Sequence, residues 1–250
     1  MSYHDLHDWL KDVETHGELA HLTGANWDLE MSGISELVYE SGKVKEPRPA
    51  LLFDETPGYP KGYRTLFGML DSVWRLAKTL GLPEDQTDRM ALLRNWRNKA
   101  KDLRPIPPRF VSSGPVLENS LTGEDIDILK FPSPRFHEHD RKRYFGTAHS
   151  VIQKDPEGDW VNLGTYRNMV IDRNHLAVRS TEGHHGSIIM FEKYFSKGQV
   201  MPIAIAVGTD PILWHLSCEP STPWGVSEYD VAGGIKGEPI EVIEGPYSGL

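Results

Sequence analysis

Apolar residues in the first part of the chain recur mostly at helical spacing. This spacing predicts helices over residues 3–16, 32–41 and 64–81, and an apolar run at 49–53 (PALLF) predicts a buried strand between the last two. Glycines after residues 16 and 80 are typical of helix ends. The positions that define the helical faces are Leu6, Trp9, Leu10, Val13, Ile34, Leu37, Val38, Leu70, Val73, Trp74, Ala77 and Leu80. Helices that alternate with a strand predict an α/β arrangement.

The pattern changes after residues 103–115, a segment rich in proline, serine and glycine that predicts a linker or surface crossover. Short apolar runs bounded by turns follow, as is typical of an antiparallel barrel or sandwich. The predicted elements are strands at 144–154, 160–171, 175–180 and 201–207, a helix at 187–197 and a helix that begins near Asp210. We therefore expect an α+β chain with an N-terminal α/β domain at 1–112 and a strand-rich domain at 113–250.

Charge and composition exclude several classes of partner. Twenty-seven basic and 36 acidic residues give a net charge of −9, and the basic segment 94–104 has the spacing of a solvated helix or loop, so we expect no nucleic-acid partner. No apolar run approaches the ~20 residues of a membrane span, and the charged N-terminus lacks a secretory signal. The single cysteine, Cys218, allows no internal disulfide and no all-thiolate metal site. We expect a cytoplasmic protein with no membrane partner.

The segment VNLGTYR at 161–167 places polar side chains beside a glycine in an apolar setting. Alternation along a strand would put Asn162, Gly164 and Tyr166 on one face, and Gly164 would let a flat ligand approach the backbone. Arg167 could hold a carboxylate by two parallel charge-assisted hydrogen bonds. For this segment alone, an ordinary strand with an arginine at the sheet edge is the favoured interpretation.

Two further segments carry groups that could bind a metal. In EGHHG at 182–186 the histidines precede a predicted helix, where imidazole stays neutral readily, and adjacent histidines are expected to have different roles. In the glycine-rich segment 223–239, Glu228 offers a hard oxygen ligand. Asn162, His185 and Glu228 together would suit manganese or magnesium better than zinc, although their spacing leaves open whether they meet.

Other polar residues are weaker candidates for a functional site. His137 and His139 alternate, but we interpret their segment as an exposed turn. Cys218 has no basic neighbour and no evident histidine partner, which argues against a nucleophile. The chain contains no nucleophile elbow, P-loop or dinucleotide fingerprint, so a flavin would not bind through a Rossmann turn.

Several of these motifs, taken in order, resemble the signature segments of UbiD-type decarboxylases. The matching segments are NLGTYR at 162–167, the histidine pair at 184–185 and GVSEYDVAGGIKGEP at 225–239, together with GEL at 17–19, PALLF at 49–53, LFG at 66–68 and residues 77–81. The resemblance covers nearly the whole chain, and the members that it looks closest to act on aromatic and heteroaromatic acids.

The resemblance implies a non-oxidative, reversible decarboxylation of an aromatic, heteroaromatic or α,β-unsaturated carboxylic acid. It implies prenylated FMN in a split β-barrel domain related to flavin reductases, with Mn²⁺ or Mg²⁺ and often K⁺ at the cofactor phosphate. By position, the divalent-metal ligands would be Asn162, His185 and Glu228, and Arg167 would hold the substrate carboxylate. The positions implied to contact the cofactor are Asn162, Gly164, Thr165, Tyr166, Arg167, His184, Ser217, Cys218 and Pro220.

Family members continue into a strand with catalytic glutamates and then into a C-terminal domain, both absent from this chain. The resemblance therefore implies a second polypeptide or a missing C-terminal half, and a homo- or hetero-oligomer. A non-catalytic flavin- or metal-binding subunit, or a truncated inactive fragment, is the alternative. A metal-dependent hydrolase built on the three metal-ligand candidates is a weaker reading, because no general base is evident.

Overall fold

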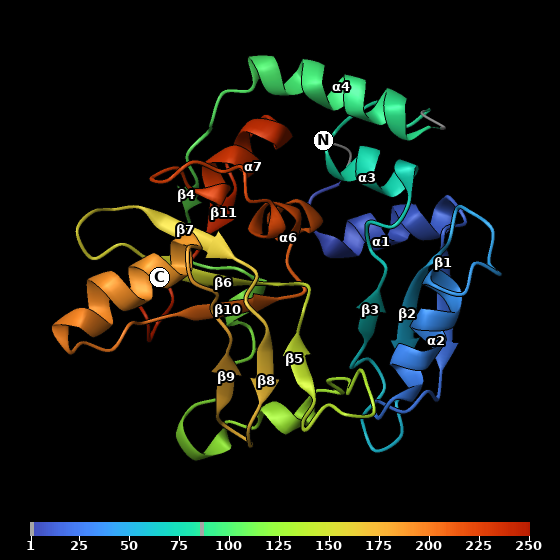
Figure 1. Ribbon diagram of the computed structural model, residues 1–250, viewed down its shortest axis with the longest axis horizontal. Helices are drawn as coiled ribbons and strands as arrows, with labels where there is room; N and C mark the ends of the chain where they lie inside the picture. Colours follow the sequence, from blue (N-terminus) through green and yellow to red (C-terminus); the bar gives the residue numbers. More distant parts are fainter. Residues whose placement is uncertain (1–2, 86–87) are drawn as a thin grey trace.

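The computed structural model describes residues 3–85 and 88–250 (Figure 1). The first part of the chain forms a three-stranded sheet of order β1-β2-β3, in which β1 runs parallel and β3 antiparallel to β2. Its elements are α1 (Leu6–Thr15), β1 (Leu19–Thr23), α2 (Glu30–Tyr39), β2 (Ala50–Asp54), β3 (Thr65–Phe67), α3 (Val73–Thr79) and α4 (Arg89–Asp102).

Two predictions for this part are confirmed. Helix α1 buries Trp9, Leu10 and Val13, and Gly17 follows it with a φ of 82°, a conformation that glycine adopts readily. Strand β2 is buried from residue 50 to 53, as its unbroken apolar sequence predicted. The central strand therefore anchors this layer.

The predicted face of α2 is wrong in part. The helix begins at Glu30, and Ile34 and Val38 pack against the sheet, but Leu37 is 62% exposed. Its place in the core is taken by Met31, which lay outside the predicted helix. The helix begins two residues before the predicted start, so Met31 also belongs to it. Apolar spacing alone does not determine which of several apolar residues faces the sheet.

The predicted helix over residues 64–81 is also wrong in its first half. Residues 65–67 pair with β2 instead, and Gly68 then turns the chain with a φ of 64°. A side chain at Gly68 would meet the ring of Tyr39, so only glycine fits. The Ser72 hydroxyl accepts a hydrogen bond from the Arg75 amide at 3.0 Å and starts α3 there.

The second part of the chain contains two antiparallel three-stranded sheets, of order β10-β6-β7 and β5-β8-β9. The described residues form no closed barrel, and short helices connect and cover these sheets (Figure 1). The elements are β4 (Arg109–Phe110), β5 (Tyr144–Gly146), β6 (His149–Lys154), β7 (Val161–Gly164), β8 (Asn168–Val170), β9 (Leu176–Val178), α5 (His185–Ile188), β10 (Ala204–Val207), α6 (Pro211–Cys218), α7 (Glu228–Lys236) and β11 (Glu241–Val242).

The predicted strands and helices of this part are largely confirmed. Helix α5 continues as a π-helix at Ile189–Tyr194 and a 3₁₀ turn at Phe195–Lys197, so the observed helix begins at His185, two residues before the predicted start. Asp210 caps α6 as predicted, since its carboxylate accepts from the Ile212 amide at 3.0 Å. The predicted linker contains strand β4, which pairs with β11, and the glycine-rich segment after residue 223 forms helix α7.

The largest apolar cluster connects the two parts of the chain. Leu80 and Leu92 lie in one cluster with Leu216 of α6 and Ile235 of α7. Figure 1 shows α6 between the N-terminal helices and strands β6 and β7. This shared core positions the end of α6 beside β7, where the candidate site lies; the domain boundary at 112 and 113 stays a prediction.

Within the described residues, no helix combines the length and apolar character that a membrane crossing requires.

Candidate functional site

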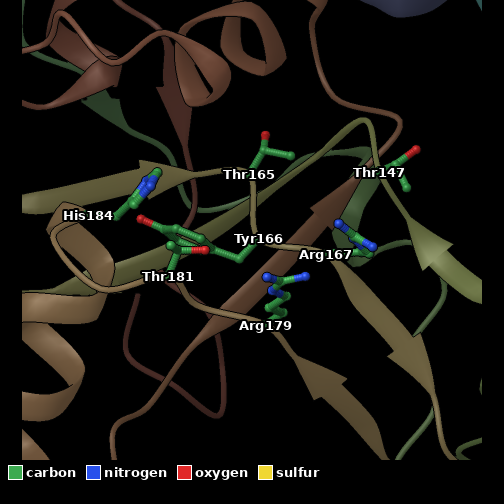
Figure 2. Close-up of a pocket in the computed structure, with 7 residues that line it drawn as sticks. All are labelled: Thr147, Thr165, Tyr166, Arg167, Arg179, Thr181 and His184. Atoms are coloured by element: carbon green, nitrogen blue, oxygen red, sulfur yellow. The ribbon is translucent and has the colours of Figure 1, made fainter.

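A cavity of about 350 Å³ opens where β7 ends and the chain leaves its sheet (Figure 2). Its size is at the lower end for a small-molecule site. The residues that line it are Thr147, Thr165, Tyr166, Arg167, Arg179, Thr181 and His184. Four of these seven residues were predicted from the sequence.

Arg167 lies in the short connection, residues 165–167, between β7 and β8. The predicted strand over 160–171 therefore divides, and regular alternation ends at Gly164. The Thr165 amide donates to the Ser217 carbonyl at 2.9 Å, and the Tyr166 carbonyl accepts from His149 Nε2 at 2.9 Å. Both contacts hold the segment outside the sheet.

Two glycines make room for the ring of Tyr166. A Cβ on Gly164 would lie 2.4 Å from Tyr166 Cζ, and one on Gly186 would lie 2.5 Å from the Tyr166 hydroxyl. The Gly186 amide donates to that hydroxyl at 3.0 Å. The space beside Gly164, where the sequence suggested that a flat ligand could approach, is thus filled by Tyr166 itself.

Asn162 of β7 and Glu228 of α7 both lie near Tyr166, which lines the cavity. Both are buried, at 2% and 3% exposure, and Glu228 Oε2 accepts from the Leu163 amide at 2.7 Å. Asn162 Nδ2 donates to Gln153 Oε1 at 3.2 Å. Desolvation by burial raises the pKa of Glu228 to about 7.

His185 is the first residue of α5 and lies one residue before Gly186. Its ring packs edge-to-face against Trp160 and Trp224, with centroid distances of 5.5 and 5.2 Å. Desolvation, then the neighbouring His184, lowers the pKa of His185, which favours the neutral imidazole. Gln153 Nε2 lies 3.5 Å from the Gly186 carbonyl, so this side chain connects the start of α5 with Asn162.

No group of three or more His, Cys, Asp or Glu side chains in residues 3–85 and 88–250 is arranged to hold a metal ion. The predicted set contains only two such residues, and its third member is the amide of Asn162. The structure brings Glu228, the first residue of α7, to the amide of Leu163, which follows Asn162 on β7. Gln153 connects Asn162 with Gly186, the residue after His185.

The two histidines have different positions, as predicted. His184 precedes α5 and lines the cavity, with its ring 6.5 Å from that of Tyr166. His185 instead packs between tryptophans. His137 and His139 are exposed in a turn, which confirms their interpretation.

The end of α6 contacts the segment after β7 through one backbone carbonyl and the thiol of Cys218. The Ser217 hydroxyl is buried and bonds Ser150 at 2.7 Å. The Cys218 thiol donates to the Thr165 hydroxyl at 3.2 Å, and desolvation raises its pKa. Pro220 is exposed in the following turn and does not line the cavity.

Sequence reasoning missed Gln153, Thr147, Arg179 and Thr181. Arg179 lies within the predicted strand 175–180 and Thr181 follows it, and their approach to Arg167 depends on the pairing of β8 with β9. That pairing has no signal in a single sequence.

Comparisons with known proteins place this architecture among carboxy-lyases. A family model described as the 3-octaprenyl-4-hydroxybenzoate carboxy-lyase Rift-related domain matches residues 109–250. The model of the corresponding N-terminal domain matches residues 10–92. The chain belongs to the UbiD family.

Two relatives of this chain are named as decarboxylases. Pyrrole-2-carboxylic acid decarboxylase of Pseudomonas aeruginosa is 35% identical over 98% of this chain and 49% of its own length. Phenolic acid decarboxylase of a Streptomyces species is 31% identical over 100% of this chain and 52% of its own length. The chain thus spans about half the length of the relatives it matches.

Solved structures show the same fold. Vanillic acid decarboxylase of Sedimentibacter hydroxybenzoicus in its closed form matches with a TM-score of 0.85 and 25% identity, over 100% of this chain and 52% of its own. A dimeric form of the UbiD-class enzyme HmfF from Pelotomaculum thermopropionicum, in complex with prFMN, matches with a TM-score of 0.82 and 24% identity, over 98% and 53%.

Proposed function

We propose that this chain forms the part of a prenylated-FMN-dependent decarboxylase that holds the cofactor, a divalent metal and the substrate carboxylate. The observation that carries the proposal is the convergence of Arg167, Tyr166 and His184 on one cavity, with Glu228 buried behind it. The substrate would be an aromatic, heteroaromatic or α,β-unsaturated carboxylic acid, as among the decarboxylases that this chain resembles.

The residues behind the cavity fit a divalent cation. Glu228 is a buried carboxylate whose pKa is raised by desolvation, so a nearby cation would stabilise its anionic form. Asn162, His185 and Glu228 would hold Mn²⁺ or Mg²⁺ through an amide oxygen, a neutral imidazole and a carboxylate. Potassium near residues 217–220 belongs to the same proposal.

Prenylated FMN, when bound, supplies an electron sink for the electron pair that departing carbon dioxide leaves behind. Tyr166, Thr165 and His184 would contact it, since they offer an aromatic face, a hydroxyl and an imidazole at one cavity. Gly164 and Gly186 would act indirectly, because they fix the position of the Tyr166 ring.

Arg167 would orient the reacting carboxylate. Its guanidinium lies 5.8 Å from the centre of the Tyr144 ring, a cation–π contact that restricts its direction. A planar fork of donors matches a carboxylate and fixes the plane of the bond to be broken.

A second polypeptide or further chain would complete the site, in a homo- or hetero-oligomer. The two sheets of the second part would then belong to a split barrel. A cytoplasmic location is part of the proposal.

A non-catalytic cofactor-binding subunit is the second candidate. The observation that favours it is the composition of the cavity lining, which contains no carboxylic acid to donate a proton.

The test is production of the chain together with a prenylated-flavin synthase and Mn²⁺, with and without the second half of a related decarboxylase. We expect a flavin absorbance spectrum and a two-chain native mass, and loss of the flavin in Glu228→Gln but not in the exposed control Glu182→Gln. Absence of flavin in every preparation would contradict the proposal. In the active complex, Arg167→Ala abolishes turnover if Arg167 orients substrate, whereas unchanged turnover identifies a non-catalytic subunit.

A further inference from the structure

Three aromatic side chains, Trp160, His185 and Trp224, form one cluster beside the residues proposed to hold the divalent cation. The ring of His185 packs edge-to-face against both indoles, with centroid distances of 5.5 Å to Trp160 and 5.2 Å to Trp224. The two indoles also pack against each other, with centroids 4.5 Å apart. Each ring of the cluster therefore contacts the other two.

The cluster joins the three segments that carry the proposed metal ligands. Trp160 lies two residues before Asn162, immediately before β7. Trp224 lies four residues before Glu228, in the turn that leads to α7, and His185 is itself the first residue of α5. A single set of ring contacts thus brings together β7, the start of α5 and the start of α7.

Polar contacts hold the two tryptophans in place. The Trp160 indole Nε1 donates to the Val226 carbonyl at 2.9 Å, which connects β7 to the turn before α7. The Lys193 ammonium lies 5.3 Å from the centre of the Trp224 ring and donates to the buried carboxylate of Asp155. Although Trp224 is 44% exposed, these contacts restrict its direction.

The direction of the His185 ring depends on these aromatic contacts. Among residues 3–85 and 88–250, neither ring nitrogen of His185 has a hydrogen-bond or ion-pair partner. A histidine that binds a metal usually donates its other ring nitrogen to a carboxylate or carbonyl, and this hydrogen bond fixes the ring. In this chain the two indoles supply the constraint and leave a ring nitrogen for a ligand.

We propose that Trp160 and Trp224 are positioning residues, which fix the imidazole of His185 as a ligand of the divalent cation. The inference rests on the proposed function for the presence of the cation. It predicts that the indoles raise the affinity for the metal, because a ligand that is already oriented loses less freedom when the metal binds.

The test measures Mn²⁺ affinity in the two-chain complex with flavin. Metal is removed with a chelator, Mn²⁺ is titrated back, and free Mn²⁺ is measured by electron paramagnetic resonance, without turnover. We expect Trp224→Leu to weaken Mn²⁺ binding about tenfold, as is typical when a group that orients a metal-binding histidine is removed. Trp224→Phe retains an aromatic ring and should keep most of the affinity.

A second pair of stacked histidine and tryptophan rings provides the matched control. Trp74 stacks on His16 with centroids 3.8 Å apart, in the first part of the chain. Trp74→Leu therefore removes a contact of the same kind away from the proposed ligands and should leave Mn²⁺ affinity unchanged. Circular dichroism and thermal unfolding check that each variant folds.

The ring contact itself can be measured without metal or flavin. In the chain labelled with ¹³C at histidine Cε1, the His185 signal is identified by its absence in His185→Gln. Trp224→Leu should shift this signal, because the ring current of the indole is lost, whereas Trp74→Leu should shift the signal of His16 instead.

Several outcomes would overturn the inference. They are an unchanged Mn²⁺ affinity in Trp224→Leu, an equal loss in Trp74→Leu, a loss that is as large in Trp224→Phe, or a His185 signal that Trp224→Leu does not shift. If the unaltered complex binds flavin and Mn²⁺, each of these results leaves the proposed function standing. A complex that binds no Mn²⁺ would contradict the metal site of the proposed function, and this inference with it.

Discussion

The arginines of the two parts of the molecule have opposite environments. Arg75 in α3 is 0% exposed, and its guanidinium donates to Glu18 at 2.5 Å, to the Met69 carbonyl at 2.9 Å and to the Arg48 carbonyl at 2.8 Å. This side chain connects β1, the turn before α3 and the segment before β2. Its charge is neutralised entirely within the chain.

Arg167 and Arg179 are exposed, face one cavity and have no carboxylate partner in the described residues. A buried charge costs several kcal/mol unless it is paired, so Arg75 must be matched for the chain to fold. A charge at a cavity can stay unmatched in the unliganded protein because water solvates it. The difference separates an arginine that stabilises the fold from two that are available to a ligand.

Replacing Arg75 should produce the largest effect. Arg75→Met leaves the buried carboxylate of Glu18 without its arginine partner, although the Ser72 hydroxyl still donates to it at 2.6 Å and His16 lies 3.7 Å away. The free energy of unfolding should therefore fall by about 3 kcal/mol. Urea denaturation monitored by tryptophan fluorescence measures it. Arg167→Met should change stability by less than about 0.5 kcal/mol, and the double variant Arg75→Met/Glu18→Met should recover much of the loss. An equal loss of stability in Arg75→Met and Arg167→Met would contradict the claim that only Arg75 stabilises the fold.

The two parts of the molecule also differ in the space that surrounds their glycines. Gly186→Ala places a methyl group 2.2 Å from Gln153 Oε1 and 2.5 Å from the Tyr166 hydroxyl, so it should cost about 1–3 kcal/mol. Gly33 of α2 has no atom within 4 Å of an added Cβ, and Gly33→Ala should be neutral or stabilise by up to about 1 kcal/mol. Thermal unfolding of both variants tests this, and an unaffected Gly186→Ala would mean that Tyr166 is loosely held.

The free energy of unfolding should fall at acid pH because of His149, which lies beside the cavity segment. Desolvation lowers the pKa of this buried histidine below its usual 6.5, so the folded protein favours the neutral ring. The resulting stability is present above pH 6.5 and is lost as the pH falls through that value, because the unfolded chain binds the proton first. Urea denaturation from pH 7.5 to 5.5 should show this loss, and His149→Gln should reduce it. The same slope in both proteins would assign the acid sensitivity to other groups, such as the half-buried His215, whose pKa desolvation also lowers.

The smallest expected change in stability comes from removing one of the two cavity arginines. Arg179→Leu removes one of two opposed like charges and should stabilise the unliganded chain by up to about 0.5 kcal/mol at low salt. The gain should shrink at high salt, since ions screen the repulsion. Arg179→Leu that destabilises the chain at low salt would show that the arginine already has a stabilising partner.

Much of the local structure could be predicted because its signals are local. The spacing of Trp9 and Val13, the unbroken run from residue 50 to 53 and the Asp210–Pro211 cap each produced the expected element. Three residues over 65–67 were wrongly assigned to a helix, because their sequence is too short to distinguish a helix start from a strand that needs a partner.

The candidate site was predictable only where its residues are close in sequence. Thr165, Tyr166 and Arg167 were found together because one motif carries them, and His184 because it follows a turn. Thr147 and Arg179 come from other strands, and only the register of β8 and β9 places Arg179 opposite Arg167.

The sequence by itself determined the helices of α1 and α6, the buried central strand and the motifs of the UbiD family. The tertiary structure alone decided that Tyr166 fills the space beside Gly164, that Glu228 of α7 contacts β7 next to Asn162, and that two arginines share one cavity. The physical reason is the distance along the chain over which each interaction acts. Periodicity and capping depend on neighbours within a turn or two, whereas strand register and side-chain packing depend on contacts between residues that are distant in the chain.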